Sequence, residues 1–153
     1  MDTTLSTLRA WPLWQKARHF TVSAVHEDSA TGARVEEFCQ TLARCLERTS
    51  EIRKEMWLLT ELRTSQLRVI AAGEAAVADL VIVSVHHAEA LPSEVKSWID
   101  LWLKQRGNRP AVLLALFDPL YLGTSNSMQT YLREVARRGN MEFLARSEDK
   151  PED

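Results

Sequence analysis

The sequence predicts a three-layer α/β fold, in which helices cover both faces of a five-stranded parallel sheet. Two nearly continuous apolar runs, at 79–85 and 111–117, are typical of central strands that are buried on both faces. Helical patterns alternate with strand-like segments along the chain, and short connections join them. Because right-handed crossovers restrict the topologies open to such a chain, we expect the strand order 2-1-3-4-5.

The first half of the chain predicts two strands and two helices. Residues 19–25 alternate apolar and polar side chains, as the first strand of a half-buried sheet does. Residues 52–59 mix β-branched and aromatic side chains with charged ones, which fits a strand at the edge of the sheet. Residues 67–78 are rich in alanine and predict a weakly patterned helix. A helix between the two strands is predicted from Ala33 onward by one apolar face, formed by Val35, Phe38, Cys39, Leu42 and Leu46.

The second half predicts three strands and two helices. The two buried runs are the third and fourth strands, and a short fifth strand follows at 141–145. Pro92 suits the first turn of a helix that ends at Gly107, and Gly139 suits the end of the last helix. These two helices have apolar stripes, formed by Val95, Trp98, Ile99, Trp102 and Leu103 in one and by Met128, Tyr131, Leu132 and Val135 in the other.

The composition limits the classes of molecule with which the protein is expected to interact. The 153 residues are 45% hydrophobic and 26% charged, with a net charge of −2, which favours one domain whose core needs neither disulfides nor metal. The near-neutral charge supplies no basic field for nucleic-acid phosphates, so a nucleic-acid partner is disfavoured. No apolar run approaches the roughly 18 to 20 residues that a membrane-spanning helix requires, so a membrane protein is disfavoured too.

The cysteines and the amino terminus predict a cytoplasmic protein. The first residues lack the basic start, apolar centre and small-residue cleavage site of an export signal. Cys39 and Cys45 lie six positions apart in a helical pattern, on different faces, so a disulfide between them is geometrically poor. We therefore expect reduced thiols, with Cys39 on the apolar face of its helix.

We expect one folded unit over 19–146. An N-terminal extension, 1–18, precedes it, and an acidic tail that frays, 147–153, follows it. The extension has an apolar cluster at 11–14 that covers the sheet or reaches a partner chain, and the sequence leaves both open. The apolar stripe with Trp98 and Trp102 predicts that this helix packs against the sheet. If the stripe is wider than the sheet can cover, the uncovered apolar surface would form a homodimer interface.

Ligands of such sheets bind outside the carboxyl ends of the strands, where the strand order reverses. The first loop there runs into a helix, whose free N–H groups and dipole favour a phosphate, and Ser29, Thr31 and Gly32 supply hydroxyls and a glycine. The same hydroxyls also suit a helix N-cap at Ser29 or Thr31, which needs no ligand. Function is therefore expected in three loops, at 27–34, 86–91 and 118–127.

Several motifs resemble a known family. Residues 29–34 resemble the flavodoxin phosphate loop, with Arg34 where that pattern ends in threonine. The resemblance extends to NADPH-dependent FMN reductases over about residues 19 to 145, through Ala78-Asp79 before the third strand, Leu91-Pro92, Val95-Lys96, Ile99-Asp100, and Asn108-Arg109-Pro110 before the fourth strand. It implies a flavodoxin-like fold, often dimeric, that binds FMN.

The flavin-reductase resemblance implies a set of cofactor contacts. Bound FMN would accept hydride from a nicotinamide cofactor, as in an NAD(P)H-dependent flavin oxidoreductase, and no catalytic side chain is identified. Glu27 and Asp28 place two carboxylates just before the phosphate loop, and the second loop begins His86-His87 where the reductases have a Pro-x-Tyr-Asn-like sequence. The implied FMN-binding residues are Ser29, Thr31, Gly32, Arg34, His86, His87 and Tyr121.

A second resemblance, to response-regulator receiver domains, rests on Glu27 and Asp28. Paired acids after the first strand hold Mg²⁺ in receivers, whose third strand ends in a phosphorylated aspartate. Here Ser84 stands at that aspartate's position and Arg146 at the position of the receiver lysine. This resemblance implies a receiver-like regulatory module that is not phosphorylated and that acts through its surfaces on a protein partner.

Histidines and carboxylates also gather at the predicted strand ends. Imidazole and carboxylate groups suit Zn²⁺ or another first-row metal, but the spacing matches no recognised ligand signature. Polar residues are common at the ends of such strands, and we therefore predict no metal site. The residues concerned are His26, Glu27, Asp28, His86, His87 and Glu89.

Overall fold

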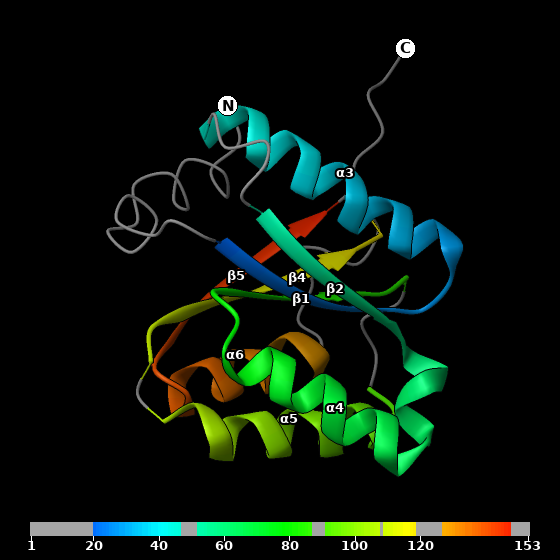
Figure 1. Cartoon of the computed structure of the whole chain (residues 1–153), viewed down its shortest axis with the longest axis vertical. Helices are drawn as coiled ribbons and strands as arrows, with labels where there is room; N and C mark the ends of the chain where they lie inside the picture. The colour runs from blue at the N-terminus through cyan, green and yellow to red at the C-terminus, as the bar shows by residue number, and fades with distance from the viewer. Residues whose placement is uncertain (1–19, 47–51, 87–90, 108, 119–126, 148–153) are drawn as a thin grey trace.

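The computed structural model describes residues 20–46, 52–86, 91–107, 109–118 and 127–147, and it confirms the predicted three-layer architecture (Figure 1). All strand pairs are parallel, and the sheet has the order β2-β1-β3-β4-β5. The strands are β1 (Phe20–His26), β2 (Ile52–Leu58), β3 (Leu80–Ser84), β4 (Ala111–Phe117) and β5 (Met141–Ser147). The helices are α3 (Ser29–Leu46), α4 (Ser65–Ala76), α5 (Ser93–Arg106) and α6 (Ser127–Arg138), with a short 3₁₀ helix, η1 (Leu59–Arg63).

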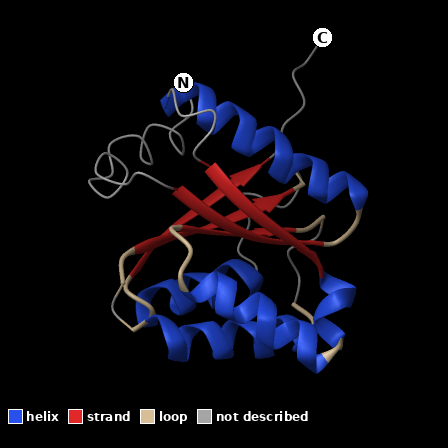
Figure 2. Cartoon of the chain, viewed as in Figure 1, coloured by secondary structure: helices blue, strands red, loops and turns tan. Residues whose placement is uncertain are grey.

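Helices cover both faces of the sheet, as Figure 2 shows by colour. Helix α3 lies over one face, and α4, α5 and α6 lie side by side over the other (Figure 1). Each face therefore has its own apolar layer, and the larger layer lies under the three helices. Every residue of β3 and β4 is buried, which explains their nearly unbroken apolar sequences. The architecture is the flavodoxin-like α/β sandwich.

Helix α3 begins earlier than predicted. We expected a loop over 27–34 and a helix from Ala33, but the helix starts at Ser29, and only Glu27 and Asp28 separate it from β1. The apolar periodicity misses the first turn because Ser29 and Ala30 are exposed and carry no apolar pattern. The segment that resembles a phosphate loop is therefore the first turn and a half of a helix.

The end of α6 also corrects a prediction. Gly139 was expected to cap the helix, but the residue with a left-handed backbone is Asn140, with φ of 57°. Gly139 is buried, and a Cβ atom on it would lie 2.8 Å from Leu103 Cδ2. The end of α6 therefore packs closely against Leu103 of α5, and a larger residue at position 139 would require that side chain to move. Gly107, in contrast, has φ of 64° and ends α5 as predicted.

The tryptophan stripe of α5 is core. Trp98 and Trp102 are fully buried, and their rings meet edge to face with centroids 5.8 Å apart. The prediction that these tryptophans pack in the core is confirmed. Neither ring is exposed, so neither is available for the homodimer interface that we considered. Cys39 is buried as well, and burial raises the pKa of its thiol to about 11, as expected for an inert core cysteine.

Some predicted features lie outside the described residues: the N-terminal extension 1–18, most of the tail 147–153, and the side chain of Cys45. The remaining boundaries are close to their predictions. Strand β1 is shifted by one residue toward the C-terminus, α4 begins and ends two residues early, and β5 extends two residues farther. Within the described residues, no helix combines the length and apolar character needed to cross a bilayer.

Candidate functional site at the carboxyl ends of the strands

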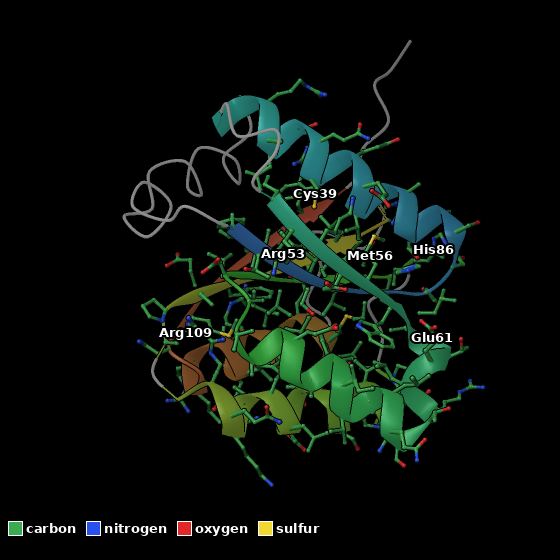
Figure 3. All side chains as sticks on the ribbon, in the orientation of Figure 1. Cys39, Arg53, Met56, Glu61, His86 and Arg109 are labelled. Atoms are coloured by element: carbon green, nitrogen blue, oxygen red, sulfur yellow. The ribbon has the colours of Figure 1, made fainter. Side chains whose placement is uncertain are left out.

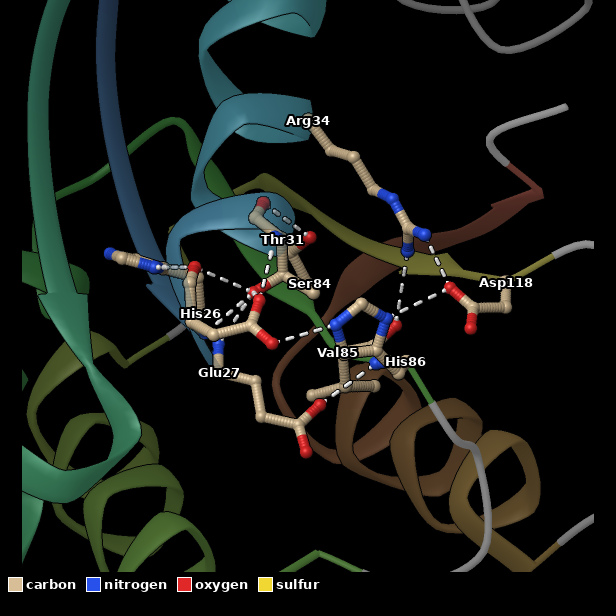
Figure 4. A network of polar contacts seen from close by, with 9 residues as sticks. His26, Glu27, Thr31, Arg34, Ser84, Val85, His86 and Asp118 are labelled. Carbon is tan, nitrogen blue, oxygen red and sulfur yellow. Dashed lines mark hydrogen bonds and ion pairs between the residues drawn. The ribbon is translucent and has the colours of Figure 1, made fainter. Parts of the chain in front are cut away.

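The carboxyl ends of β1, β3 and β4 lie side by side. His26 at the end of β1 is in register with Ser84 at the end of β3, which in turn is in register with Leu116 of β4. The segments that follow these strands bring charged side chains together (Figure 4). Figure 3 shows His86 at this end of the molecule and Arg109 at the opposite end. The order reverses between β1 and β3, so this is where such folds bind ligands.

Asp28 caps helix α3. Its Oδ1 accepts a hydrogen bond of 2.9 Å from the backbone N–H of Thr31, two residues after the first helical residue. In return, the buried Thr31 Oγ1 accepts hydrogen bonds from the backbone N–H groups of Glu27 (2.8 Å) and Asp28 (2.9 Å). This reciprocal pairing is a capping box with threonine at its third position. The prediction of an N-cap at Ser29 or Thr31 is wrong, because the side chain that receives the helix N–H belongs to Asp28.

The backbone hydrogen bond from Thr31 holds the pKa of Asp28 below its usual range, and hydrogen bonds with His86 and the Thr31 side chain act in the same direction. The carboxylate is therefore negatively charged at neutral pH. It lies at the positive end of the α3 dipole, where a bound phosphate would otherwise lie. A phosphate at this helix terminus would have to displace or oppose this charge.

Gly32 permits close contact between the first turn of α3 and the end of β1. A Cβ atom at this position would lie 2.8 Å from Nδ1 and 2.9 Å from Cε1 of His26. The His26 ring is held there by a contact of 3.0 Å between Nδ1 and the backbone oxygen of Asp28. The glycine is therefore needed to accommodate this histidine.

His86 links the loops that follow three strands. Its Nε2 lies 2.8 Å from Asp28 Oδ2, and its Nδ1 lies 3.2 Å from Asp118 Oδ1. Its backbone N–H also donates to Glu27 Oε1 at 2.9 Å. Partial burial by itself lowers the pKa of the imidazole, but the hydrogen bonds and charges of both aspartates raise it, and the net shift is upward. The arrangement favours an imidazolium that donates to one carboxylate on each side (Figure 4).

Arg34 completes the cluster from α3. Its guanidinium forms an ion pair with Asp118 and donates a hydrogen bond of 3.4 Å to the backbone oxygen of Val85. Burial raises the pKa of Asp118, but the hydrogen bonds from Arg34 and His86 together lower it by more, so that the net shift is downward. We call Asp28, Arg34, His86 and Asp118 the His86 cluster. It contains two carboxylates, one guanidinium and one imidazole, and the imidazole adds a second positive charge when it is protonated.

Ser84 has a structural contact at the position of the receiver phosphoacceptor. Its side chain is fully buried, and Oγ donates a hydrogen bond of 2.9 Å to the backbone oxygen of Thr31. This bond joins the end of β3 to the first turn of α3. A buried hydroxyl in this contact is not presented to a phosphoryl donor.

The structure brings together some of the predicted FMN-binding residues. Thr31, Arg34 and His86 belong to one hydrogen-bonded network, and Gly32 lies beside it. Ser29 is exposed in the first helical turn. His87 and Tyr121 lie outside the described residues.

Sequence reasoning did not identify Asp118 as a partner of His86. The available signal was a carboxylate directly after a buried strand, which the sequence shows at Asp118 after the apolar run 111–117. Within the described part of the chain, no group of three or more histidine, cysteine, aspartate or glutamate side chains is arranged to hold a metal ion. The site is therefore a hydrogen-bonded cluster of charges that can exchange a proton at His86.

The fold and this cluster define the protein as a flavodoxin-like α/β sandwich with an aspartate–histidine–aspartate arrangement at its strand ends. Comparison with known proteins found no match among protein-family models, curated proteins or solved structures.

We expect the His86 cluster to make stability depend on pH. The folded-state pKa of His86 lies above 6.5, the usual value for the unfolded chain. The stabilisation that the protonated imidazole provides is therefore fully present below pH 6.5 and is lost as the pH rises through the folded-state pKa. The pKa values of Asp28 and Asp118 are lowered in the folded chain. The stabilisation that these carboxylates provide is therefore present above pH 3.8 and is lost as the pH falls through their folded-state pKa values. Urea unfolding should therefore show the wild-type chain to be more stable than His86→Gln by about 1 kcal/mol near pH 5.

As the pH rises through the folded-state pKa of His86, which lies above 6.5, the stability difference between the wild-type chain and His86→Gln should shrink because the imidazole loses its charge. Asp28→Asn is the matched control, because it keeps the imidazole but removes one carboxylate partner and should lower the pKa of His86 in an NMR titration. Parallel pH profiles for the wild-type chain and His86→Gln would show that the imidazole makes no charge-dependent contribution.

Proposed function

We propose that the protein is a non-enzymatic, receiver-like regulatory module that acts through contacts with protein surfaces. The observation that carries the proposal is the contact of both His86 ring nitrogens with carboxylates, on Asp28 and Asp118. These contacts span the strand ends where an open α/β sheet would bind a ligand. Charged side chains of the protein itself therefore occupy this edge of the sheet. They connect the segments that follow β1, β3 and β4.

The layout resembles a receiver without its phosphoryl chemistry. Glu27 and Asp28 follow β1, as the paired acids of receivers do, but Asp28 is used as a helix cap and Glu27 accepts the backbone N–H of His86. The end of β3 supplies the buried Ser84 hydroxyl in place of an aspartate. A module of this kind would respond to a proton at His86 and would transmit the response through the loops that this side chain joins.

The FMN-reductase proposal has less support from the geometry. The two-residue connection between β1 and α3 leaves no extended phosphate loop, and the residues that resembled one are helical. The Thr31 N–H already donates to Asp28, and the adjacent carboxylates would repel a phosphate. Flavin binding at this position would require the first turn of α3 to rearrange.

The test is a flavin titration of the full chain. Purified protein is mixed with FMN, freed of excess by desalting, and its visible absorption is recorded. We expect no retained flavin at micromolar protein, and no change in intact mass after incubation with Mg²⁺ and a small-molecule phosphoryl donor.

Asp28→Asn is the matched variant in the flavin titration, since it removes the opposing charge and keeps the side-chain size. We expect it also to retain no flavin, because the backbone of the first turn remains helical. A flavin spectrum near one equivalent in the wild-type chain, lost in Thr31→Glu, would overturn the proposal in favour of a flavin oxidoreductase. A mass increase of one phosphoryl group would overturn its non-phosphorylated character.

A further inference from the structure

The ring of His86 faces one carboxylate on each side, and a neutral imidazole can donate to only one of them. Nε2 lies 2.8 Å from Asp28 Oδ2, and Nδ1 lies 3.2 Å from Asp118 Oδ1. An ionised carboxylate only accepts hydrogen bonds, so each contact requires a proton on the ring nitrogen. The imidazolium has both protons, whereas the neutral ring has one and presents a lone pair at its other nitrogen. Loss of a proton therefore removes the hydrogen bond at one of the two contacts.

We propose that His86 is a proton-controlled link between the segments that follow β3 and β4, and that the ring keeps Asp28 and releases Asp118 when it becomes neutral. The inference rests on the proposed function, because it names how the regulatory module is controlled. It goes beyond the pH dependence of stability, since it assigns the change to one side of the His86 cluster.

Asp118 has a second cation at the oxygen that faces His86. The guanidinium of Arg34 forms an ion pair with Asp118 Oδ1, and Figure 4 shows Arg34 and His86 both directed toward this carboxylate. A guanidinium keeps its charge over the whole pH range in which a histidine titrates. Asp118 therefore retains a charged partner when the imidazole becomes neutral, and it can give up the longer contact with Nδ1 at a small cost.

Asp28 is held on the His86 side by the start of α3. Its Oδ1 accepts the backbone N–H of Thr31, which fixes the carboxylate while Oδ2 contacts Nε2 of His86 at the shorter distance. The backbone N–H of His86 also donates to Glu27 Oε1 at 2.9 Å, so the connection between β1 and α3 holds His86 at two points. We therefore expect the one proton of the neutral ring at Nε2.

The other charged groups near the ring agree with this assignment. Among the described residues, Glu27 contacts the backbone of His86, and the ring of His26 packs against Gly32 at the end of β1. Partial burial lowers the pKa of His86, but the aspartates on both sides raise it by more, so the net shift is upward from 6.5. Both ring contacts are therefore present below pH 6.5, and the contact with Asp118 is lost as the pH rises through the folded-state pKa.

Release of Asp118 weakens the last connection between the ends of β3 and β4. The backbone N–H of Asp118 donates to the backbone oxygen of His86 at 3.3 Å, and one step earlier the N–H of Val85 donates to the oxygen of Leu116 at 3.1 Å. The outer hydrogen bond joins the same two residues as the side-chain contact, so it should open first when that contact is lost. The proton therefore controls the start of the segment after β4, while the segment after β1 stays attached to His86.

The tautomer of the neutral His86 ring tests the direction of the release. In the nitrogen-labelled full chain, long-range proton–nitrogen NMR spectra recorded through a pH titration give the pKa of the ring and show which nitrogen keeps the proton. We expect the Nε2–H form above the measured pKa. The Nδ1–H form, or an equal mixture of the two forms, would overturn the proposal.

Amide hydrogen exchange tests the release itself. The Asp118 N–H reports the contact with the β4 side, and the His86 N–H reports the contact with the β1 side. From one pH unit below the measured pKa to one unit above it, the protection factor should fall about fivefold at Asp118 and less than about twofold at His86. Equal losses at both amides would contradict an asymmetric release, and constant protection at both would contradict any switch.

Arg34→Gln tests why Asp118 is the contact that is released. It removes the competing guanidinium from Asp118, so we expect neutral His86 to become a mixture of both tautomers. Arg137→Gln is the matched control, because it removes a guanidinium from the exposed ion pair with Glu134 on α6 and should preserve the Nε2–H form. A wild-type tautomer in Arg34→Gln would refute the selection by the guanidinium, and the wild-type measurements decide the proposal if this variant does not fold.

These measurements are independent of the flavin titration. A chain that retains no FMN but has neutral His86 in the Nδ1–H form contradicts this inference and leaves the proposed non-enzymatic function standing. A chain that retains FMN overturns the proposed function, whatever the tautomer of His86.

Discussion

Replacing Trp98 by alanine is expected to lower the free energy of unfolding by about 3–5 kcal/mol. The side chain is fully buried between α5 and the sheet and meets Trp102 edge to face. Alanine would leave a cavity that the closely packed sheet residues around it cannot fill, and it would also remove the aromatic contact. Chemical denaturation with urea, followed by circular dichroism, measures the change.

Trp98→Phe is the matched control for this cavity. The indole Nε1 is buried without a hydrogen-bond partner, so phenylalanine removes an unsatisfied donor while keeping much of the apolar ring. We expect a cost below about 2 kcal/mol. If Trp98→Ala instead left stability unchanged but altered the oligomeric state, the α5 stripe would be an interface and its burial in the core would be refuted.

Replacing Thr31 by valine is expected to cost about 2 kcal/mol, although the two side chains have nearly the same shape. The hydroxyl is buried and accepts hydrogen bonds from the backbone N–H groups of Glu27 and Asp28. It also donates toward Asp28, either to the backbone oxygen or to Oδ1, both at 3.0 Å. Valine leaves these groups unsatisfied and frees the turn that positions Asp28 beside His86.

Ser29→Ala separates this role from a phosphate loop. Ser29 and Thr31 were both predicted phosphate contacts, but Ser29 is exposed in the first turn while Thr31 is buried. We expect Ser29→Ala to change the free energy of unfolding by less than about 0.5 kcal/mol. Equal costs for the two variants would contradict the capping arrangement, and thermal unfolding of both variants in one buffer is sufficient to compare them.

The architecture was predictable because its signals are local. The apolar runs that became β3 and β4 are buried on both faces, and such burial leaves no room for polar residues in the pattern. The start of α3 was not predictable from periodicity, because its first turn is exposed and carries no apolar face. The cap could have been inferred from Asp28 with a hydroxyl residue three positions later, which is a variant of a known capping pattern.

The site was only partly predictable. Candidate residues were expected at the ends of the strands, and Thr31, Arg34 and His86 do meet there. The pairing of His86 with Asp118, 32 residues away, depends on where β4 lies beside β3. Residue spacing within one segment does not predict a contact between residues so far apart in the sequence.

The class of fold, the buried central strands and the core position of the α5 tryptophans were predictable from residue spacing, because burial imposes a periodicity along the chain. The position of His86 between two carboxylates and the exposure of the apolar residues of α4 were visible only in the folded structure. The physical reason is that the contacts of a polar side chain depend on which strands are neighbours. The exposure of a helix face depends on what packs against it, and neither is encoded in the spacing of residues along one segment.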